Sequence, residues 1–341
     1  SHSSKRTGAM TNSSCKIINR HFTHVFLPAV YVSVFIIGFI ANCWGLRHVI
    51  RNWKKMGKIN VFVLNLGIAD LLYVVTLPFL VAYYASSSEW MFGEVFCKIT
   101  RFCFHLNLYG SIGFLTCISV YRYLGIVHPM KIMGRITLRH SVGVCFVVWV
   151  LVIVQILPDM FFDKSYPQSS NACFDTTANH LLKLYMPYSI GWTVTGFGIP
   201  SLIILGCYGH VAVVLSTKAN VNTLLKQRCL KLVVILTILF SVCFIPYHLL
   251  RNLNMKTRLL QLEGKCHESF NKIYISYQVS RGLACMNSAM NPLIYLVSND
   301  DFIMRFHSMS KRARRSVVQL RNVIHYRRPT NECDSPNTSK E

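Results

Sequence analysis

Long apolar runs alternate along the chain with short polar connections. Seven of these runs reach the roughly 20 residues that a helix needs to cross a bilayer. They span residues 25–50, 59–84, 97–124, 141–162, 188–216, 230–254 and 273–298. Lipid offers the backbone no hydrogen-bond partners, so each run is expected to be a helix. The pattern predicts an all-α membrane protein, a seven-transmembrane helix bundle whose termini lie on opposite sides of the membrane.

Composition supports this prediction. The 341 residues are 52% hydrophobic and 14% charged, against about 25% charged in soluble proteins. The net charge of +23 is typical of nucleic-acid binders as well. A soluble nucleic-acid binder does not alternate basic segments with membrane-length apolar runs, so nucleic acid is excluded as a partner.

The basic residues predict the orientation of the bundle. Segments 51–60, 125–140 and 217–231 carry four, three and four Lys or Arg with no acid, and the chain from Asn299 adds nine. The positive-inside rule assigns these segments to the cytoplasm. The amino terminus is therefore expected outside the cell and the carboxyl terminus inside, in a multi-pass protein of the plasma membrane.

The regions that flank the bundle are polar. Residues 1–24 form the predicted extracellular tail, with a glycosylation sequon at Asn12 and no apolar segment typical of a cleavable signal. Residues 25–298 form the bundle, and apolar positions at helical spacing in 299–310 predict a helix on the inner membrane surface. Residues 311–341 are predicted to be a disordered cytoplasmic tail. Its Ser316 follows two arginines, so kinases and arrestin are candidate partners there.

Three arginines lie toward the predicted outer ends of their spans. An arginine at membrane depth costs about 2.5–3.5 kcal/mol and usually faces a cavity. Helical spacing puts them on shared faces with other polar groups, which gives the set Arg101, His105 and Tyr109, the pair His248 and Arg251, and the pair Gln278 and Arg281. A guanidinium group binds phosphate or carboxylate through two parallel hydrogen bonds. The sequence therefore predicts an outer site for a small anion.

Each of these residues also has a purely structural explanation. A membrane arginine can extend to the lipid headgroups, and His105 can be a satisfied core histidine. Lys256, Arg258, Lys265 and Lys272 fall on the predicted third outer loop. Such a basic loop raises the local concentration of an anionic ligand.

Other spans carry residues with predictable structural roles. Pro246 and Pro292 each remove a backbone hydrogen bond and are expected to kink their helices. Asp70 lies deep in the second span, where a carboxyl group needs either a cation or a hydrogen-bonded neutral form. Four of the thirteen cysteines fall on predicted outer segments, namely Cys15, Cys97, Cys173 and Cys266. An even number predicts two disulfides, with three possible pairings.

One short motif in each span resembles the rhodopsin-like G-protein-coupled receptors. The motifs are GFIAN at 38–42, LGIAD at 66–70, Cys97 with YRY at 121–123, Trp149, Pro200, CFIP at 243–246 and NPLIY at 291–295. A closer resemblance is to the metabotropic purinoceptors, particularly the ADP-responsive group. It rests on LPAVY at 27–31, FHLNLYGS at 104–111, CFDTT at 173–177 and YQVSRGLA at 277–284.

The resemblance implies roles for the outer residues. Arg251 and Arg281 would clamp the phosphates of a nucleotide beside Tyr247 and His248, and Asp175 would pair with a cation. Base contacts would come from Tyr83, Arg101 or Gln278. The implied disulfides are Cys97–Cys173 and Cys15–Cys266.

The resemblance also implies a switch and a G-protein partner. Arg122, Tyr208 and Tyr295 would rearrange to admit a heterotrimeric G protein, of the Gq class that raises phospholipase C activity and calcium. Two positions depart from the family pattern: Tyr121 replaces the acid before Arg122, and Phe244 replaces the usual tryptophan. An allosteric sodium ion is implied at Asp70, Ser111, Asn287 and Asn291, and a hydrogen-bonded network without sodium is the alternative.

Other function classes fit less well. No HExxH, P-loop, GxSxG or paired-carboxylate motif predicts an enzyme. A transporter or channel remains a remote alternative because the chain shows no internal repeat. Among receptors, those for dicarboxylates such as succinate or 2-oxoglutarate share the arginines and are the main alternative. A peptide or lipid receptor fits less well, because arginines rather than acids lie at the predicted mouth.

Overall fold

The computed structural model describes residues 21–51, 58–128, 136–164, 173, 176–217 and 223–292, with the backbone alone at 215–217, 223–236 and 239. Every regular element in these ranges is a helix, which agrees with the predicted fold class. Several predictions lie outside the described residues. They concern Asn12, Cys15, Asp175, Tyr295, and segments 299–310 and 311–341.

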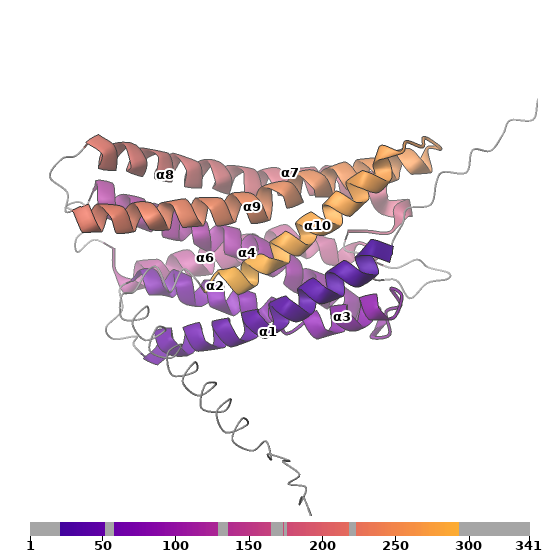
Figure 1. Cartoon of the computed structure of the whole chain (residues 1–341), viewed down its shortest axis with the longest axis horizontal. Helices are drawn as coiled ribbons and strands as arrows, with labels where there is room; N and C mark the ends of the chain where they lie inside the picture. The colour runs from indigo at the N-terminus through magenta and orange to yellow at the C-terminus, as the bar shows by residue number, and fades with distance from the viewer. Residues whose placement is uncertain are drawn as a thin grey trace, which may run out of the picture. The chain divides into compact units, whose positions relative to one another are not determined.

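The helices follow the predicted runs in order. They are α1 (His21–Arg51), α2 (Ile59–Val74), α3 (Leu77–Ala85), α4 (Gly93–Val127), α6 (Leu138–Ile156), η2 (Leu157–Phe161), η3 (Asn179–Leu181), α7 (Leu182–Thr193), η4 (Val194–Gly198), α8 (Ile199–Thr217), α9 (Thr223–Leu262) and α10 (Ser269–Met290). In Figure 1 the long helices lie side by side, and α10 packs against both α9 and α1. The helix α4 contacts α2, α6 and α8.

Five stretches in the described part of the chain are long and apolar enough to cross a membrane. They are His21–Arg51, Ile59–Ala85, Gly93–Val127, Leu138–Phe161 and Asn179–Val214. The other two predicted spans reach residues whose side chains or backbone lie outside the described ranges. Many large apolar side chains remain exposed, such as Ile37 at 58%, Phe146 at 69% and Leu202 at 72%. Lipid rather than water suits so apolar a surface.

Prolines divide two of the predicted spans. Pro78 has no N–H to give to the preceding turn, and the second span breaks at residues 75–76 between α2 and α3. The fourth span ends in the 3₁₀ turn η2, which contains Pro158. The fifth span is interrupted by the π-helical turn η4 between α7 and α8. Such wide turns occur frequently at functional sites.

The third outer connection is shorter than predicted. The helix α9 continues to Leu262 and α10 begins at Ser269, so Lys256 and Arg258 lie on α9 and Lys272 lies on α10. The guanidinium group of Arg258 is part-buried and donates to Thr176 Oγ1 at 2.7 Å and to the Thr177 carbonyl at 2.9 Å. The predicted loop position was therefore wrong for Lys256, Arg258 and Lys272. Arg258 joins α9 to the connection between η2 and η3.

Candidate ligand-binding site

The three outer arginines are buried between helices. The exposed fractions are 2% for Arg101 on α4, 0% for Arg251 on α9 and 3% for Arg281 on α10. A side chain that extended to the headgroups would leave its guanidinium group exposed, so the snorkelling alternative does not hold for any of the three. Burial of a charge is costly unless polar groups surround it, and each of these arginines has such groups beside it.

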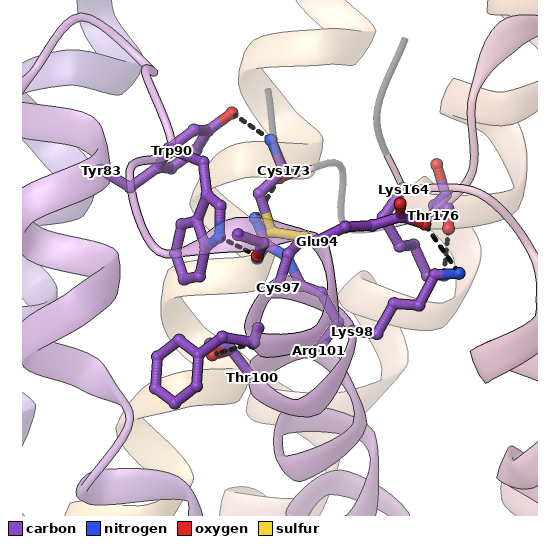
Figure 2. Close-up of a disulfide and its surroundings, with 12 residues drawn as sticks. Tyr83, Trp90, Glu94, Cys97, Lys98, Thr100, Arg101, Lys164, Cys173 and Thr176 are labelled. Carbon is purple, nitrogen blue, oxygen red and sulfur yellow. Dashed lines mark hydrogen bonds and ion pairs between the residues drawn. A yellow bond between two sulfur atoms is a disulfide. The ribbon is translucent and has the colours of Figure 1, made fainter. Parts of the chain in front are cut away.

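Arg101 lies directly beneath a disulfide. Cys97 and Cys173 are joined, with their Cα atoms 5.8 Å apart, so the pairing implied by the resemblance is confirmed. Arg101 donates through Nη2 to the Cys173 carbonyl at 2.5 Å, and the Cys173 N–H donates to the Tyr83 hydroxyl at 3.3 Å. Figure 2 shows the disulfide with Tyr83 and Arg101 near it. The bridge thus fixes the acceptor that orients Arg101.

The second disulfide is only partly visible. Cys266 is disulfide-bonded, whereas Cys15 lies outside the described residues. The pairing of these two cysteines stays a prediction.

Arg281 is held by tyrosine. It donates through Nη2 to the Tyr84 hydroxyl, and its guanidinium carbon lies 5.4 Å from the centre of the Tyr84 ring. Tyr84 in turn packs edge-on against Tyr83, with ring centres 4.7 Å apart. Arg101 and Arg281 therefore lie on one connected set of groups, which joins α3, α4 and α10.

Arg251 lies in a second cluster, formed by α7 and α9. It donates through Nη2 to the Tyr185 hydroxyl at 2.8 Å. Its guanidinium carbon lies 4.7 Å from the centre of the Trp192 ring, a distance at which a cation is attracted to the face of an aromatic ring. Nε and Nη1 of Arg251 have no hydrogen-bond partner among the described residues.

The predicted partners of the arginines surround Trp192. Tyr109 stacks on Trp192 with ring centres 4.9 Å apart, and His105 meets it edge-on at 4.6 Å. His248 lies 5.5 Å from the Tyr109 ring and stacks on Phe197 at 4.3 Å. The Tyr109 hydroxyl and both His248 nitrogens lack hydrogen-bond partners in the described part of the chain. Buried polar atoms without protein partners are expected to bind water or a ligand.

Tyr247 on α9 packs against both α4 and α10. Its ring lies 5.8 Å from Phe104 on α4 and 6.1 Å from Tyr277 on α10. Gln278 follows Tyr277 and is 5% exposed, and its Oε1 has no hydrogen-bond partner in the described ranges. Apart from Asp175, every residue predicted to bind the ligand is therefore buried at the same end of the bundle.

Four residues of this region, Asp159, Lys164, Tyr185 and Trp192, were not predicted from the sequence. Asp159 on η2 accepts hydrogen bonds from Lys164 Nζ and the Tyr185 hydroxyl, both at 2.7 Å, and Trp192 supports Arg251. One signal was present: Asp159 is an acid inside a predicted span, and such residues are usually functional. The aromatic residues gave no signal, because aromatic side chains are common throughout the spans.

Gly196 in the π-helical turn permits the close approach of Tyr109. A Cβ at this position would lie 2.6 Å from the Tyr109 ring and 2.2 Å from Gln155 Nε2. The glutamine can swing away, but Tyr109 is fixed by its stack on Trp192. We expect Gly196→Ala to displace Tyr109 and to lower the melting temperature, because overpacking destabilises a fold by about 1–3 kcal/mol. Gly191→Ala is the matched control because its Cβ would meet nothing within 4 Å, and equal melting temperatures of the two variants would contradict the prediction.

Asp70 lies in a fully buried polar network. Its Oδ1 accepts from Asn107 Nδ2 at 2.7 Å, and both its oxygens accept from Asn291 Nδ2 at 3.0 Å. The Ser111 hydroxyl lies 3.5 Å from the same two amide nitrogens. Asn287 is 1% exposed and its Nδ2 has no hydrogen-bond partner in the described residues. Asn107 belongs to this network although the sequence did not predict it there, and the sodium ion stays a prediction.

Of the predicted switch residues, Tyr208 and Arg122 lie toward the other end of the bundle, whereas Phe244 and Pro246 lie on α9 just before Tyr247. The hydroxyls of Tyr208 and Ser119 are 2.7 Å apart, which joins α8 to α4. Arg122 is half-buried one turn beyond Ser119. Phe244 is fully buried and packs edge-on against Phe240, and Pro246 lies within α9. Pro292 lies in the turn after α10.

Comparison with known proteins identifies the family. The family model of the seven-transmembrane receptors of the rhodopsin family matches residues 41–295. Purinoceptor 1 of Rattus norvegicus, a metabotropic purinoceptor, is 40% identical over 322 residues, which cover 93% of this chain and 86% of the relative. The human protein of the same name is 39% identical with the same coverage. Purinoceptor 4 of Xenopus laevis, from the same group, is 37% identical over 93% of this chain and 59% of the relative. The chain therefore belongs to the rhodopsin family of seven-transmembrane receptors, which are not enzymes, and within it to the metabotropic purinoceptors.

Proposed function

We propose that this receptor binds an extracellular adenine nucleotide such as ADP or ATP. The observation that carries the proposal is the burial of Arg101, Arg251 and Arg281 at one end of the bundle. Three cations removed from water require a multiply charged anion or polar groups that replace it. The relatives named purinoceptors support a phosphate-bearing anion over a dicarboxylate. In the proposal, Arg251 and Arg281 bind phosphate, and Tyr247, His248 and Gln278 line the remainder of the site.

The proposal includes the signal inside the cell. The receptor would act in the plasma membrane with its amino terminus outside, and would activate a heterotrimeric G protein of the Gq class, with phospholipase C and calcium downstream. The basic segments 51–60, 125–140 and 217–231 support this orientation. Arg122, Tyr208 and Tyr295 would form the surface that receives the G protein. Ligand affinity must differ between the resting and active arrangements for any signal to pass.

A calcium assay in transfected cells tests the ligand and the pathway together. ADP, ATP, UTP, succinate and 2-oxoglutarate are applied to cells that carry the receptor at the surface, with and without an inhibitor of Gq. The proposal predicts a response to an adenine nucleotide that the inhibitor abolishes. A response to a dicarboxylate alone would contradict the ligand class, and a nucleotide response that the inhibitor leaves intact would contradict the Gq assignment.

A sodium ion beside Asp70 is a further part of the proposal. The carboxylate of Asp70, the hydroxyl of Ser111 and the side-chain carbonyls of Asn287 and Asn291 are oxygen ligands of the kind that hard cations prefer. The buried position of Asp70, at 0% exposed, favours a bound cation over an uncompensated carboxylate. The ion would stabilise the resting arrangement of the network that also includes Asn107.

Asp70→Asn is expected to remove the effect of sodium on agonist affinity. In the unmodified receptor, replacing sodium with N-methyl-D-glucamine should raise agonist affinity, because the competing resting state loses its ion. The variant has no charge to hold sodium and should bind the agonist equally in both buffers. Sodium sensitivity that persists in Asp70→Asn would place the ion elsewhere. Ser33→Ala is a suitable control, because Ser33 is exposed and bonds only to its own helix.

A further inference from the structure

Four buried polar side chains form a series of hydrogen bonds that ends on Arg251. It begins at Lys164, whose Nζ donates to Asp159 Oδ1 at 2.7 Å. The Tyr185 hydroxyl donates to the same oxygen at 2.7 Å and accepts from Arg251 Nη2 at 2.8 Å. All four side chains are at most 3% exposed. The chain thus links η2, α7 and α9 by hydrogen bonds shielded from water.

Local sequence explains why the acid points inward. Pro158 follows Leu157, and η2 winds residues 157–161 into a tight 3₁₀ turn at the end of α6. This turn brings Asp159 between His105 on α4 and Tyr185 on α7, with His105 Nδ1 3.4 Å from Asp159 Oδ2. Leu157 and Phe161, which flank the acid in the same turn, are 46% and 80% exposed, whereas Asp159 is 2% exposed. The acid is therefore the residue of this turn that enters the bundle.

This series of hydrogen bonds holds the Arg251 side chain in one orientation. A free arginine side chain has several rotatable bonds, and ordering it costs about 2 kcal/mol of rotamer entropy. Here Nη2 is held by Tyr185 and the guanidinium plane lies over Trp192, while Nε and Nη1 have no hydrogen-bond partner among the described residues. A guanidinium group held at one end, with donors left over, is arranged to receive an anion without further ordering.

From this geometry we infer that Asp159 is a positioning residue for anion recognition, which acts on Arg251 through the Tyr185 hydroxyl. The inference rests on the proposed nucleotide function and adds the residue that prepares its binding group. Asp159 itself makes no contact with the ligand. Its negative charge strengthens the hydrogen bond from Tyr185, and a polarised Tyr185 hydroxyl is a better acceptor for Arg251.

The charge of Asp159, considered alone, predicts the opposite effect on ligand affinity. The sign of the change in affinity therefore distinguishes the two explanations. An acid near an anion site lowers the positive potential there, so a carboxylate without a positioning role would weaken binding, and its removal would increase affinity. A positioning carboxylate has the reverse effect. Asp159→Asn keeps the shape and removes the charge, and Tyr185→Phe removes the linking hydroxyl with no change of charge.

The first measurement is the potency of ADP in cells, at matched surface expression. Asp159→Asn and Tyr185→Phe are each expected to raise the half-maximal concentration by roughly tenfold, since a charge-assisted hydrogen bond contributes on this scale. In a receptor that already carries Arg251→Gln, neither change should have a further effect. The matched control is Asp163→Asn, four residues along the same connection, whose side chain is 47% exposed and lies 3.6 Å from His180. An unchanged or increased potency of Asp159→Asn would overturn the inference.

The second measurement needs no ligand and separates this inference from the proposed function. The melting temperature of the purified, unliganded receptor is measured for Asp159→Asn, Arg251→Gln and the double variant. Contact through Tyr185 predicts that the double variant loses less stability than the two single variants together, and that this non-additivity disappears when Tyr185→Phe is also present. Strict additivity would show that Asp159 and Arg251 are not coupled through Tyr185. Non-additivity in a receptor that ADP does not activate would support this coupling and contradict the proposed nucleotide ligand instead.

Discussion

Replacing Arg281 with alanine is expected to raise the half-maximal concentration of ADP by roughly tenfold or more, because a charge-assisted contact contributes about 1.5–3 kcal/mol. Arg281 is buried on α10, and its guanidinium group is held against Tyr84. Alanine removes the charge and leaves Tyr84 without this donor. The measurement is a concentration–response curve at matched surface expression.

Two further variants show whether the effect belongs to the site. Lys272→Ala removes a charge of the same sign from the same helix, but Lys272 is exposed. The potency of ADP at this variant should therefore stay unchanged. Arg281→Lys keeps the charge without the planar fork and should recover part of the loss. An Arg281→Ala receptor with normal surface expression and unchanged potency would remove Arg281 from the binding site.

The second large effect is expected from the disulfide between Cys97 and Cys173. The double variant Cys97→Ser/Cys173→Ser should lose most of its response to the agonist and melt at a lower temperature. The bridge closes a segment with a sequence separation of 76 residues, and loss of such a bond costs about 2–5 kcal/mol. It also fixes the Cys173 carbonyl that accepts from Arg101, so both folding and ligand recognition depend on it.

A free cysteine on the same helix provides the control. Cys103 lies on α4, six residues after Cys97, and is not disulfide-bonded. Cys103→Ser should keep the melting temperature and the potency of the unmodified receptor. If the double variant had the same melting temperature and the same agonist potency as Cys103→Ser, the disulfide would have no part in the site.

Much of the architecture could be predicted because its causes are local. A run of apolar residues long enough to cross a bilayer must become a helix, whatever its neighbours are. The burial of Arg101, Arg251 and Arg281 was also predictable, because a charged residue in such a run is costly unless it turns toward the protein interior. The pairing of Cys97 with Cys173 came from the family resemblance, since four cysteines alone leave three pairings open.

The contacts that orient the arginines could not be predicted in this way. Tyr185 binds Arg251 although 66 residues separate them, and Tyr84 binds Arg281 across 197 residues. No pattern within one span specifies which tyrosine on another helix lies opposite. The extension of α9 to Leu262 was missed for a related reason. Its last turns carry Lys256, Arg258 and Gln261 among apolar residues, and tertiary hydrogen bonds from Arg258 to Thr176 and Thr177 hold them in place.

In the proposed site, buried guanidinium groups from separate helices together bind the phosphates of one ligand. Direct binding of ADP, AMP and adenosine to the purified receptor in lipid nanodiscs tests this arrangement without any signalling partner. We predict that affinity falls in the order ADP, AMP, adenosine, and that Arg251→Gln combined with Arg281→Gln reduces ADP binding to the level of adenosine. Equal affinities for ADP and adenosine, or unchanged ADP binding by the double variant, would contradict the account.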